Sequence, residues 1–238
     1  MTPALFLAGT LALMSAAEPQ EPSRFGTFEL SLGGYKPNID AGLPNRPYET
    51  IFGANRGLMF RGDFAKTLFS GFGSLDAGVG LGYFSRSGFG LFSSNGAVSQ
   101  DSTGFHVIPT RVTLTYRFDV LVERFGIPLA PYARVAFDRY WWWVTNGSGN
   151  NAHYTNPTGQ TSWGWGATNG YSYGAGLAFL LDFLDPTLSR DLDLDTGIRH
   201  TYIFVDFTKS KVDDFGSATS WDLSDSQVTI SGGLFFVF

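Results

Sequence analysis

The sequence predicts an all-β protein that folds as a closed antiparallel β-barrel and crosses a membrane with its strands. Three observations lead to this prediction. Apolar and polar residues alternate with a period of two along eight segments, which is typical of strands whose two faces meet different surroundings. The connections between these segments are alternately long and short. Charged residues make up only 16% of the chain, against about 25% in a typical soluble domain.

The beginning of the chain has the composition of a signal peptide. Residues 4–17 are almost all apolar or small, and Ser15 and Ala17 suit a cleavage site. No Lys or Arg precedes this stretch, so either the α-amino group supplies the usual charge or translation starts upstream. The stretch is shorter than the roughly 20 residues of a transmembrane helix. We therefore expect a signal peptide at 1–17, an extended segment at 18–24 and the barrel at 25–238.

The alternating segments follow one another along the whole remaining chain. In the ambiguous segment 196–209, we assign Ile203, Val205 and Phe207 to the apolar face because the other face contains Asp206. The apolar faces span about 9–11 residues, enough for a tilted strand to cross the hydrocarbon. Eight is an even number, as in bacterial single-chain barrels. The predicted strands are 27–33, 58–65, 74–83, 108–118, 132–138, 171–182, 196–209 and 227–238.

The connections alternate in length in the manner of an outer-membrane barrel, which has long loops outside and short turns in the periplasm. We therefore expect both termini on the periplasmic side. Asp191, Asp193 and Asp195 begin like a calcium loop but lack the Gly and Glu that complete one, so we predict an acidic turn with a short helix from Pro186. The long connections are 35–56, 85–104, 144–169 and 210–224, and the short ones are 66–72, 119–128 and 184–195.

Charged residues lie almost entirely on the strand face opposite the apolar one. A charge at the bilayer midplane costs about 2–4 kcal/mol, so the apolar face should meet lipid and the charged face the lumen. An eight-stranded barrel is just wide enough for its own side chains, and buried charges pair. We favour an ion-pair plug over a conducting path, with Gly78, Gly80 and Gly82 making room inside. The predicted lumenal charges are Glu29, Arg61, Asp63, Asp76, Arg111, Arg117, Arg134, Asp138, Asp182 and Asp206.

The end of the chain carries a recognisable pattern. Ile230, Gly232, Leu234, Phe236 and the terminal Phe238 resemble the C-terminal assembly signal of bacterial outer-membrane barrels. With the signal peptide and eight strands, the chain looks like the small barrel class that includes the transmembrane domain of outer-membrane protein A. Stretches 35–40 and 200–202 also resemble a poorly characterised family of outer-membrane barrels.

This resemblance implies a location in the outer membrane of a Gram-negative bacterium. It also implies the barrel assembly machinery as a partner during biogenesis and outer-membrane lipids, including lipopolysaccharide, as surroundings. It implies no active site, cofactor or metal. The absence of Cys excludes disulfides and thiolate sites, and the net charge of −5 argues against nucleic acid as a partner.

Aromatic residues and one Arg mark the predicted outer interface. Arg139 shares the apolar parity, and we expect it to form a lipid head-group contact together with Tyr140 and Trp141. The alternative is an Arg that merely extends to water. The tryptophans around the third long loop either bind a hydrophobic ligand or, as we prefer for those on strand ends, form an interfacial aromatic girdle. These are Trp141, Trp142, Trp143, Trp163 and Trp165.

Three functions fit the sequence. The favoured one is a non-enzymatic envelope barrel that stabilises the membrane or binds partners through its loops. A narrow solute channel is the first alternative, and a lipid-modifying enzyme is the second. His106 lies near Ser102 in the sequence and His153 lies in a long loop, but neither belongs to a recognisable catalytic motif.

Overall fold

A closed eight-stranded antiparallel barrel is the fold of this chain. The computed structural model describes residues 25–91, 98–156 and 158–238, so the expected signal peptide and the segment 18–24 lie outside the described residues. The neighbour order around the described barrel is β1-β10-β9-β8-β5-β4-β3-β2, which confirms the predicted fold class. The barrel strands are β1 (Gly26–Tyr35), β2 (Gly57–Gly71), β3 (Gly73–Leu91), β4 (Val98–Arg117), β5 (Leu129–Thr145), β8 (Trp165–Leu180), β9 (His200–Val212) and β10 (Thr229–Val237).

Pairing of the first and last strands closes the barrel. Leu30 of β1 lies opposite Leu234 of β10 in this antiparallel pair. Beyond the strands, the backbone N–H of Phe25 donates to Phe238 O at 2.8 Å, and that of Phe238 donates to Gly26 O at 3.0 Å. Closure leaves no strand edge unpaired. This matters because the interior of a bilayer offers no hydrogen-bond partners to the backbone groups of a free edge.

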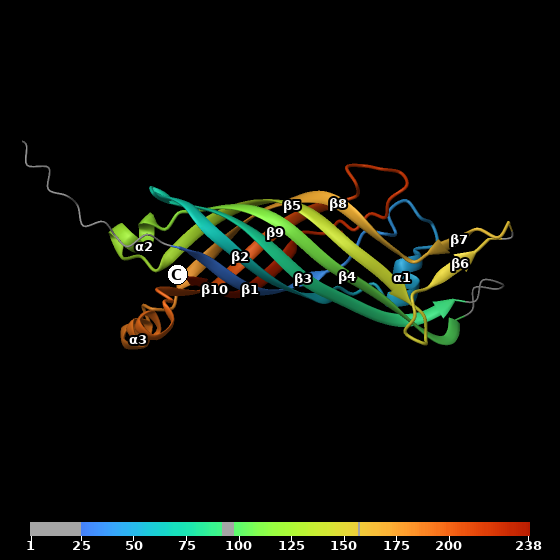
Figure 1. Ribbon diagram of the computed structural model, residues 1–238, viewed down its shortest axis with the longest axis horizontal. Helices are drawn as coiled ribbons and strands as arrows, with labels where there is room; N and C mark the ends of the chain where they lie inside the picture. The colour runs from blue at the N-terminus through green and yellow to red at the C-terminus, as the bar shows by residue number, and fades with distance from the viewer. Residues whose placement is uncertain (1–24, 92–97, 157) are drawn as a thin grey trace, which may run out of the picture.

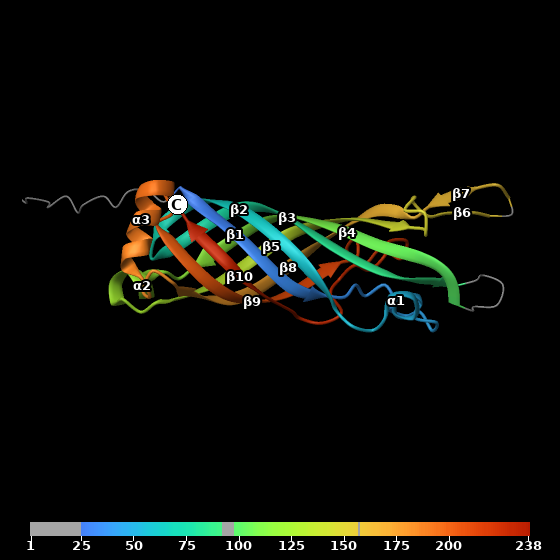
Figure 2. The same ribbon diagram turned by 90° about the horizontal axis from the view of Figure 1, so that it is seen from below.

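The two ends of the barrel differ in what they carry. The end that holds both chain ends of the barrel also holds α2 (Val120–Phe125) and α3 (Pro186–Thr196) (Figure 1). We call this the terminal end. The opposite loop end carries α1 (Pro47–Phe52) and the hairpin of β6 (His153–Thr155) and β7 (Thr161–Trp163) (Figure 2). Within the described part of the chain, no helix is long and apolar enough to span a membrane.

The acidic segment after β8 is helical, as predicted from Pro186. The Asp185 carboxylate accepts from the backbone N–H groups of Thr187 and Leu188 and caps α3, and the helix ends at Gly197, whose φ is 75°. Capping by an Asp side chain and termination by a left-handed Gly are common helix boundaries. The three aspartates therefore lie on a helix and not in a calcium loop.

The prediction is partly wrong for two of the long loops, because the strands on either side continue into them. β3 and β4 pair as far as Phe89↔Ser102 and Leu91↔Val98, so most of 85–104 is a hairpin. The connection 144–169 includes β6, β7 and the start of β8. Backbone pairing gives the reason, since antiparallel neighbours hydrogen-bond through the main chain and tolerate the Gly and Ser that resembled a loop.

Every strand of the described barrel turns large apolar side chains outward. One such residue on each strand is 48–60% exposed. In β9, Ile203 is 50% exposed and Asp206 only 2%, which is the facing predicted for the ambiguous strand. An apolar belt around a whole barrel would be a large exposed patch in water, but it matches the lipid-facing band of a membrane barrel. The eight residues are Leu32, Phe60, Val79, Val112, Val135, Tyr173, Ile203 and Ile230.

Candidate functional site in the barrel interior

The barrel interior is divided into three layers along its axis. A charged layer in the middle lies between two apolar clusters. The terminal cluster consists of Ala130, Tyr132, Ala178, Tyr202, Phe204, Phe235 and Val237. The loop-end cluster consists of Tyr35, Tyr48, Met59, Phe84, Phe105, Val107, Tyr140, Val212 and Leu223.

The sequence predicted the charged layer but not the two apolar clusters. Tyr35, Phe84 and Tyr140 share the strand parity of the charged residues, and each lies in the half of its strand nearer the loop end. Along this parity the side chains change from charged to aromatic toward the loop end, and this change is the sequence signal from which the loop-end cluster could have been predicted. At this end of the barrel, aromatic side chains fill the interior, and they need no ion-pair partner.

Arg111 and Asp63 form the best-defined ion pair of the charged layer. Arg111 Nε donates to Asp63 Oδ1 at 2.6 Å, and Nη2 donates to Oδ2 at 2.6 Å. Both residues are buried. This bidentate geometry is the strongest arrangement that Arg and a carboxylate adopt. Gly80 makes room for it, because a Cβ at Gly80 would lie 1.9 Å from Asp63 Oδ1.

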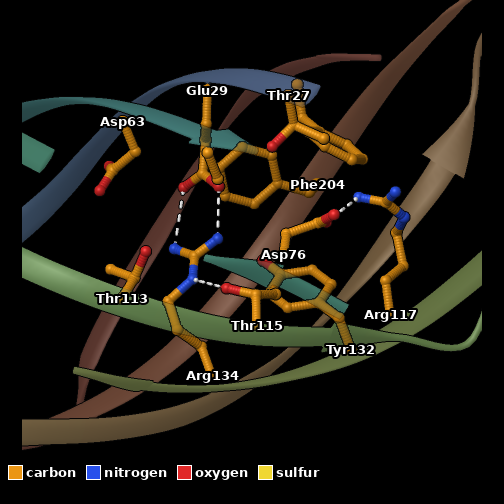
Figure 3. A pocket seen from close by; sticks show the side chains of 12 residues that line it. Thr27, Glu29, Asp63, Asp76, Thr113, Thr115, Arg117, Tyr132, Arg134 and Phe204 are labelled. Atoms are coloured by element: carbon orange, nitrogen blue, oxygen red, sulfur yellow. Dashed lines mark hydrogen bonds and ion pairs between the residues drawn. The ribbon is translucent and has the colours of Figure 1, made fainter. Parts of the chain in front are cut away.

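Arg134 forms a second bidentate pair with Glu29 (Figure 3). Arg134 Nη1 donates to Glu29 Oε1 at 3.1 Å, Nη2 donates to Oε2 at 2.5 Å, and Nε donates to Thr115 Oγ1 at 3.0 Å. Glu29 Oε1 also lies 3.9 Å from Arg111 Nη2, and Arg134 Nη1 lies 4.0 Å from Asp206 Oδ2. The two pairs therefore form one connected network, in which each buried charge has a neighbour of opposite sign.

The remaining lumenal charges lie on both sides of this network along the barrel axis, and among them Asp138 Oδ2 has no hydrogen-bond partner among the described residues. Toward the terminal end, Arg117 lies 3.2 Å from Asp76 and 3.4 Å from Asp119, and its guanidinium stands 4.7 Å over the ring of Phe235. Toward the loop end, Arg61 donates to the Tyr140 hydroxyl at 3.2 Å. Asp138 is 2% exposed and lies opposite Arg111 across the β4–β5 pair.

The space left between these side chains is small. The cavity that Glu29, Asp63, Asp76, Arg117 and Arg134 help to line has a volume of about 20 Å³ (Figure 3). One water molecule needs roughly 10–15 Å³ of such volume, so the charged layer has room for about one water. Side chains therefore fill the described lumen at this level.

One of the predicted lumenal charges lies outside the lumen. Asp182 follows the end of β8, where its Oδ2 lies 2.7 Å from His200 Nδ1 and its Oδ1 accepts from the backbone N–H of Thr201 at 3.0 Å. The two hydrogen bonds lower the pKa of this carboxyl although burial, the largest single influence, raises it. β8 ends at Leu180, and with it the alternation of inward and outward side chains. This is why the parity of Asp182 wrongly assigned it to the lumen.

The proposed head-group contact must also be revised. Arg139 faces outward, with its guanidinium 4.4 Å from the Trp141 ring and its Nη1 donating to Asn169 Oδ1 at 3.3 Å. Tyr140, by contrast, is 1% exposed and points into the loop-end cluster. Adjacent residues of a strand point to opposite faces, so including Tyr140 in an external contact was wrong.

The five tryptophans around the third long loop have different environments. Trp141, Trp163 and Trp165 are exposed. Trp142 turns inward and stacks on Trp221 with the ring centroids 4.0 Å apart and an interplanar angle of 11°. Trp143 stacks on His106. The girdle interpretation is therefore wrong for Trp142, which lies near the end of β5 but has the parity of the lumenal side chains.

His106, the residue considered for lipid hydrolysis, does not pair with Ser102. Its Nδ1 lies 3.0 Å from Ser85 Oγ and 3.1 Å from the Tyr83 hydroxyl, and its Nε2 lies 3.3 Å from Thr145 Oγ1. No carboxylate of the described residues hydrogen-bonds this ring. The contact between Ser85 and His106 therefore lacks the carboxylate that orients the His in hydrolytic triads.

The fold and its interior define a class: a small eight-stranded membrane β-barrel whose lumen is filled by its own side chains. Comparison of the sequence with protein-family models and with curated proteins gives no match. Among solved structures, the chain is similar to Ail, the attachment invasion locus protein of Yersinia pestis, in complex with the heparin analogue sucrose octasulfate. That similarity has 13% identity and a TM-score of 0.39, and covers 90% of this chain and 99% of that one.

Two further structures are similar over most of their length. Neisserial surface protein A matches with 10% identity and a TM-score of 0.44, over 90% of this chain and 97% of that chain. The N-terminal β-barrel domain of OprF from Pseudomonas aeruginosa matches with 12% identity and a TM-score of 0.39, over 91% and 100% of the two chains. At such identities the likeness concerns the fold alone.

Proposed function

We propose that this protein is a sealed, non-enzymatic barrel of a Gram-negative outer membrane that serves as a rigid scaffold for the structures at its loop end. The single observation that carries this proposal is the filled lumen. Two bidentate Arg–carboxylate pairs cross the charged layer, and the cavity left there has room for about one water. A solute path would need a continuous aqueous opening.

The assignment to the outer membrane rests on physical features of the barrel. The apolar belt requires lipid around it, and the expected signal peptide at 1–17 would direct export. In this proposal the terminal end lies in the periplasm and the loop end outside the cell. The barrel assembly machinery would act on β10, and lipopolysaccharide would surround the outer half.

Ion conductance across planar bilayers tests the sealed lumen. The purified barrel should give no steady, large conductance, whereas a general porin inserted into the same bilayer serves as the positive control. Steady conductance of porin size from the wild-type barrel would refute the proposal and favour the channel alternative.

The stability of the plug is tested separately. Arg111→Ala and Arg134→Ala should each lower the unfolding temperature, because removing one partner of a buried ion pair costs about 3–5 kcal/mol. Arg124→Ala is the control, since this Arg is exposed on α2 outside the lumen. Equal stability of all three variants would show that the lumenal pairs do not hold the barrel together.

Arg139 and Trp141 remain a proposed site for a lipid phosphate. The guanidinium already lies over the Trp141 ring, and the remaining donors of an Arg can hold a phosphate bidentately. Arg139→Gln should reduce the lipopolysaccharide that co-purifies with the barrel. Unchanged co-purification would leave an Arg that only reaches to water.

A further inference from the structure

A groove lies on the outside of the barrel at its terminal end, where α3 stands beside the start of β1 and the end of the chain (Figure 2). We call it the terminal groove. Its volume is about 510 Å³, which is in the range of roughly 300–1,000 Å³ that small-molecule sites occupy. The lining residues that matter below are Phe25, Phe64, Asp193, Thr196, Arg199 and Phe238.

The wall that the barrel contributes is apolar and continues the lipid-facing belt. Phe64 of β2 lies opposite Phe28 of β1, which in turn lies opposite Phe236 of β10. Opposed residues of neighbouring strands point to the same face, so these three rings form one outward row. Phe25 and Phe238 adjoin this row on its terminal side, and Phe25 is 63% exposed. This wall therefore suits the acyl chain of a lipid.

The wall that α3 and the following residues contribute is polar. Gly197 ends the helix, with its backbone N–H donating to Asp193 O at 3.0 Å. Asp193 and Thr196 are exposed on the last turn. The backbone N–H of Arg199 donates to Val237 O at 2.8 Å, which fixes Arg199 beside the end of β10. The lining therefore combines a carboxylate, a hydroxyl and a guanidinium with the phenyl rings of the other wall.

The charges of the polar wall discriminate between lipid head groups. The guanidinium of Arg199 can hold a phosphate bidentately, and the carboxylate of Asp193 attracts a cation. The Thr196 hydroxyl donates to Leu192 O at 2.6 Å and keeps its lone pairs for a further donor. Because α3 contains three Asp and only one Arg, it repels a lipid of net negative charge. A zwitterionic head group with a phosphate and a primary ammonium matches both charges.

We propose that the terminal groove binds one glycerophospholipid with a phosphoethanolamine head group. Arg199 contacts the phosphate, and Asp193 and Thr196 accept from the ammonium group. One acyl chain lies along Phe25 and Phe64 toward the belt. In the proposed orientation this site lies in the periplasmic leaflet, on the side opposite the lipopolysaccharide. The inference depends on the lipid-facing belt but not on the sealed lumen, so a conducting barrel would leave it intact.

Native mass spectrometry of the full barrel tests the proposal. The barrel is released from detergent micelles that contain dioleoyl phosphatidylethanolamine or dioleoyl phosphatidylglycerol at the same concentration. The second lipid has the same acyl chains and a phosphate but no ammonium. The wild-type barrel should hold one phosphatidylethanolamine saturably and about threefold more tightly than phosphatidylglycerol, as expected for one exposed ion pair. Equal affinity for the two lipids would overturn the proposal.

Two matched pairs of variants locate the lipid. Arg199→Gln should weaken phosphatidylethanolamine binding about threefold to tenfold, because a charge-assisted contact with the phosphate is lost. Lys66→Gln is its control, since Lys66 is exposed opposite Gly26 at the same end but does not line the groove. Asp193→Asn should weaken phosphatidylethanolamine and strengthen phosphatidylglycerol, which removes the preference. Asp191→Asn on the same helix should preserve it, because exposed Asp191 does not line the groove.

The contrary outcomes are specific to each pair. An equal loss of binding in Lys66→Gln and Arg199→Gln would mean general attraction to cations at the membrane edge, with an Arg199 that only reaches to water. An unchanged lipid preference in Asp193→Asn would refute the assigned head group. Heat-modifiable migration verifies that each variant is folded. Should Arg199→Gln fail to fold, the comparison of Asp193→Asn with Asp191→Asn decides.

Discussion

At the scale of single residues, the charged layer depends on a glycine as much as on the charges. Gly80 faces the lumen beside the Asp63–Arg111 pair, and its added Cβ would meet Asp63 Oδ1 at 1.9 Å. Gly80→Ala should therefore displace the carboxylate and destabilise the barrel by about 1–3 kcal/mol, as overpacked cores do. Gly62→Ala on the neighbouring strand is the control, because the nearest atom to its added Cβ is 3.6 Å away. Equal unfolding midpoints in urea for the two variants would contradict this role.

A second prediction at the residue scale concerns Asp182 at the terminal end. Its pKa is lowered in the folded protein by His200 and the Thr201 N–H, against the opposing effect of burial. The contribution to stability is therefore full above the unfolded pKa of about 3.9 and is lost as pH falls through the lower folded pKa. Asp182→Asn should cost about 1 kcal/mol near pH 7, because the pair is partly exposed. The difference from wild type should disappear as pH falls below about 4, and a difference constant with pH would exclude this linkage.

At the scale of elements, β10 both closes the barrel and carries the pattern that resembles an assembly signal. Ile230 and Leu234 face outward, and Phe236 stacks on Phe28 of β1 across the closing pair. Phe236→Asp and deletion of Phe238 should each reduce the amount of heat-modifiable barrel in the outer membrane. A matched change on the inner face, Ser231→Thr, should leave that amount nearly unchanged. Normal amounts of folded barrel for both Phe236→Asp and the Phe238 deletion would argue against β10 as the strand that the assembly machinery recognises.

The strands themselves were predictable from the sequence because each has one face in lipid and one in the barrel. Period-two alternation gave their number and facing, even in β9, where Ile203 and Asp206 decided the assignment. Strand ends were less predictable, since pairing beyond the membrane depends on the neighbouring backbone and not on side-chain alternation. The hairpin of β3 and β4 therefore extends through Gly and Ser residues that resembled a loop.

The candidate sites were predictable to different degrees for the same reason. Parity identified the residues that share the lumen, such as Arg111 and Glu29, but could not say which charges pair across the barrel. The cavity at the loop end, which α1, Phe105 and Trp221 help to line, escaped prediction altogether, because these parts are far apart in the sequence. Only the closed fold brings them to one end.

At the scale of the whole molecule, the two ends of the barrel should lie on opposite sides of the membrane. An epitope inserted at Gly147 or Asn150, in the loop-end connection, should be labelled by antibody on intact cells. An epitope in 191–195, within α3, should be labelled only after the outer membrane is permeabilised. The reverse pattern would invert the proposed orientation.

The facing of the strands in lipid can be measured by spin labelling, since the chain has no native Cys and single-cysteine variants need no background changes. Labels would be placed at two adjacent pairs, Val112 with Thr113 and Val135 with Ala136, in the barrel reconstituted in bilayers. Val112 and Val135 are exposed, whereas Thr113 and Ala136 are buried inside. Dissolved oxygen, which concentrates in lipid, should relax the labels at Val112 and Val135 far more than a water-soluble nickel complex does, and the inner labels should respond weakly to both. Stronger relaxation of the two outer labels by the nickel complex would mean that the apolar face meets water, and the membrane barrel would be refuted.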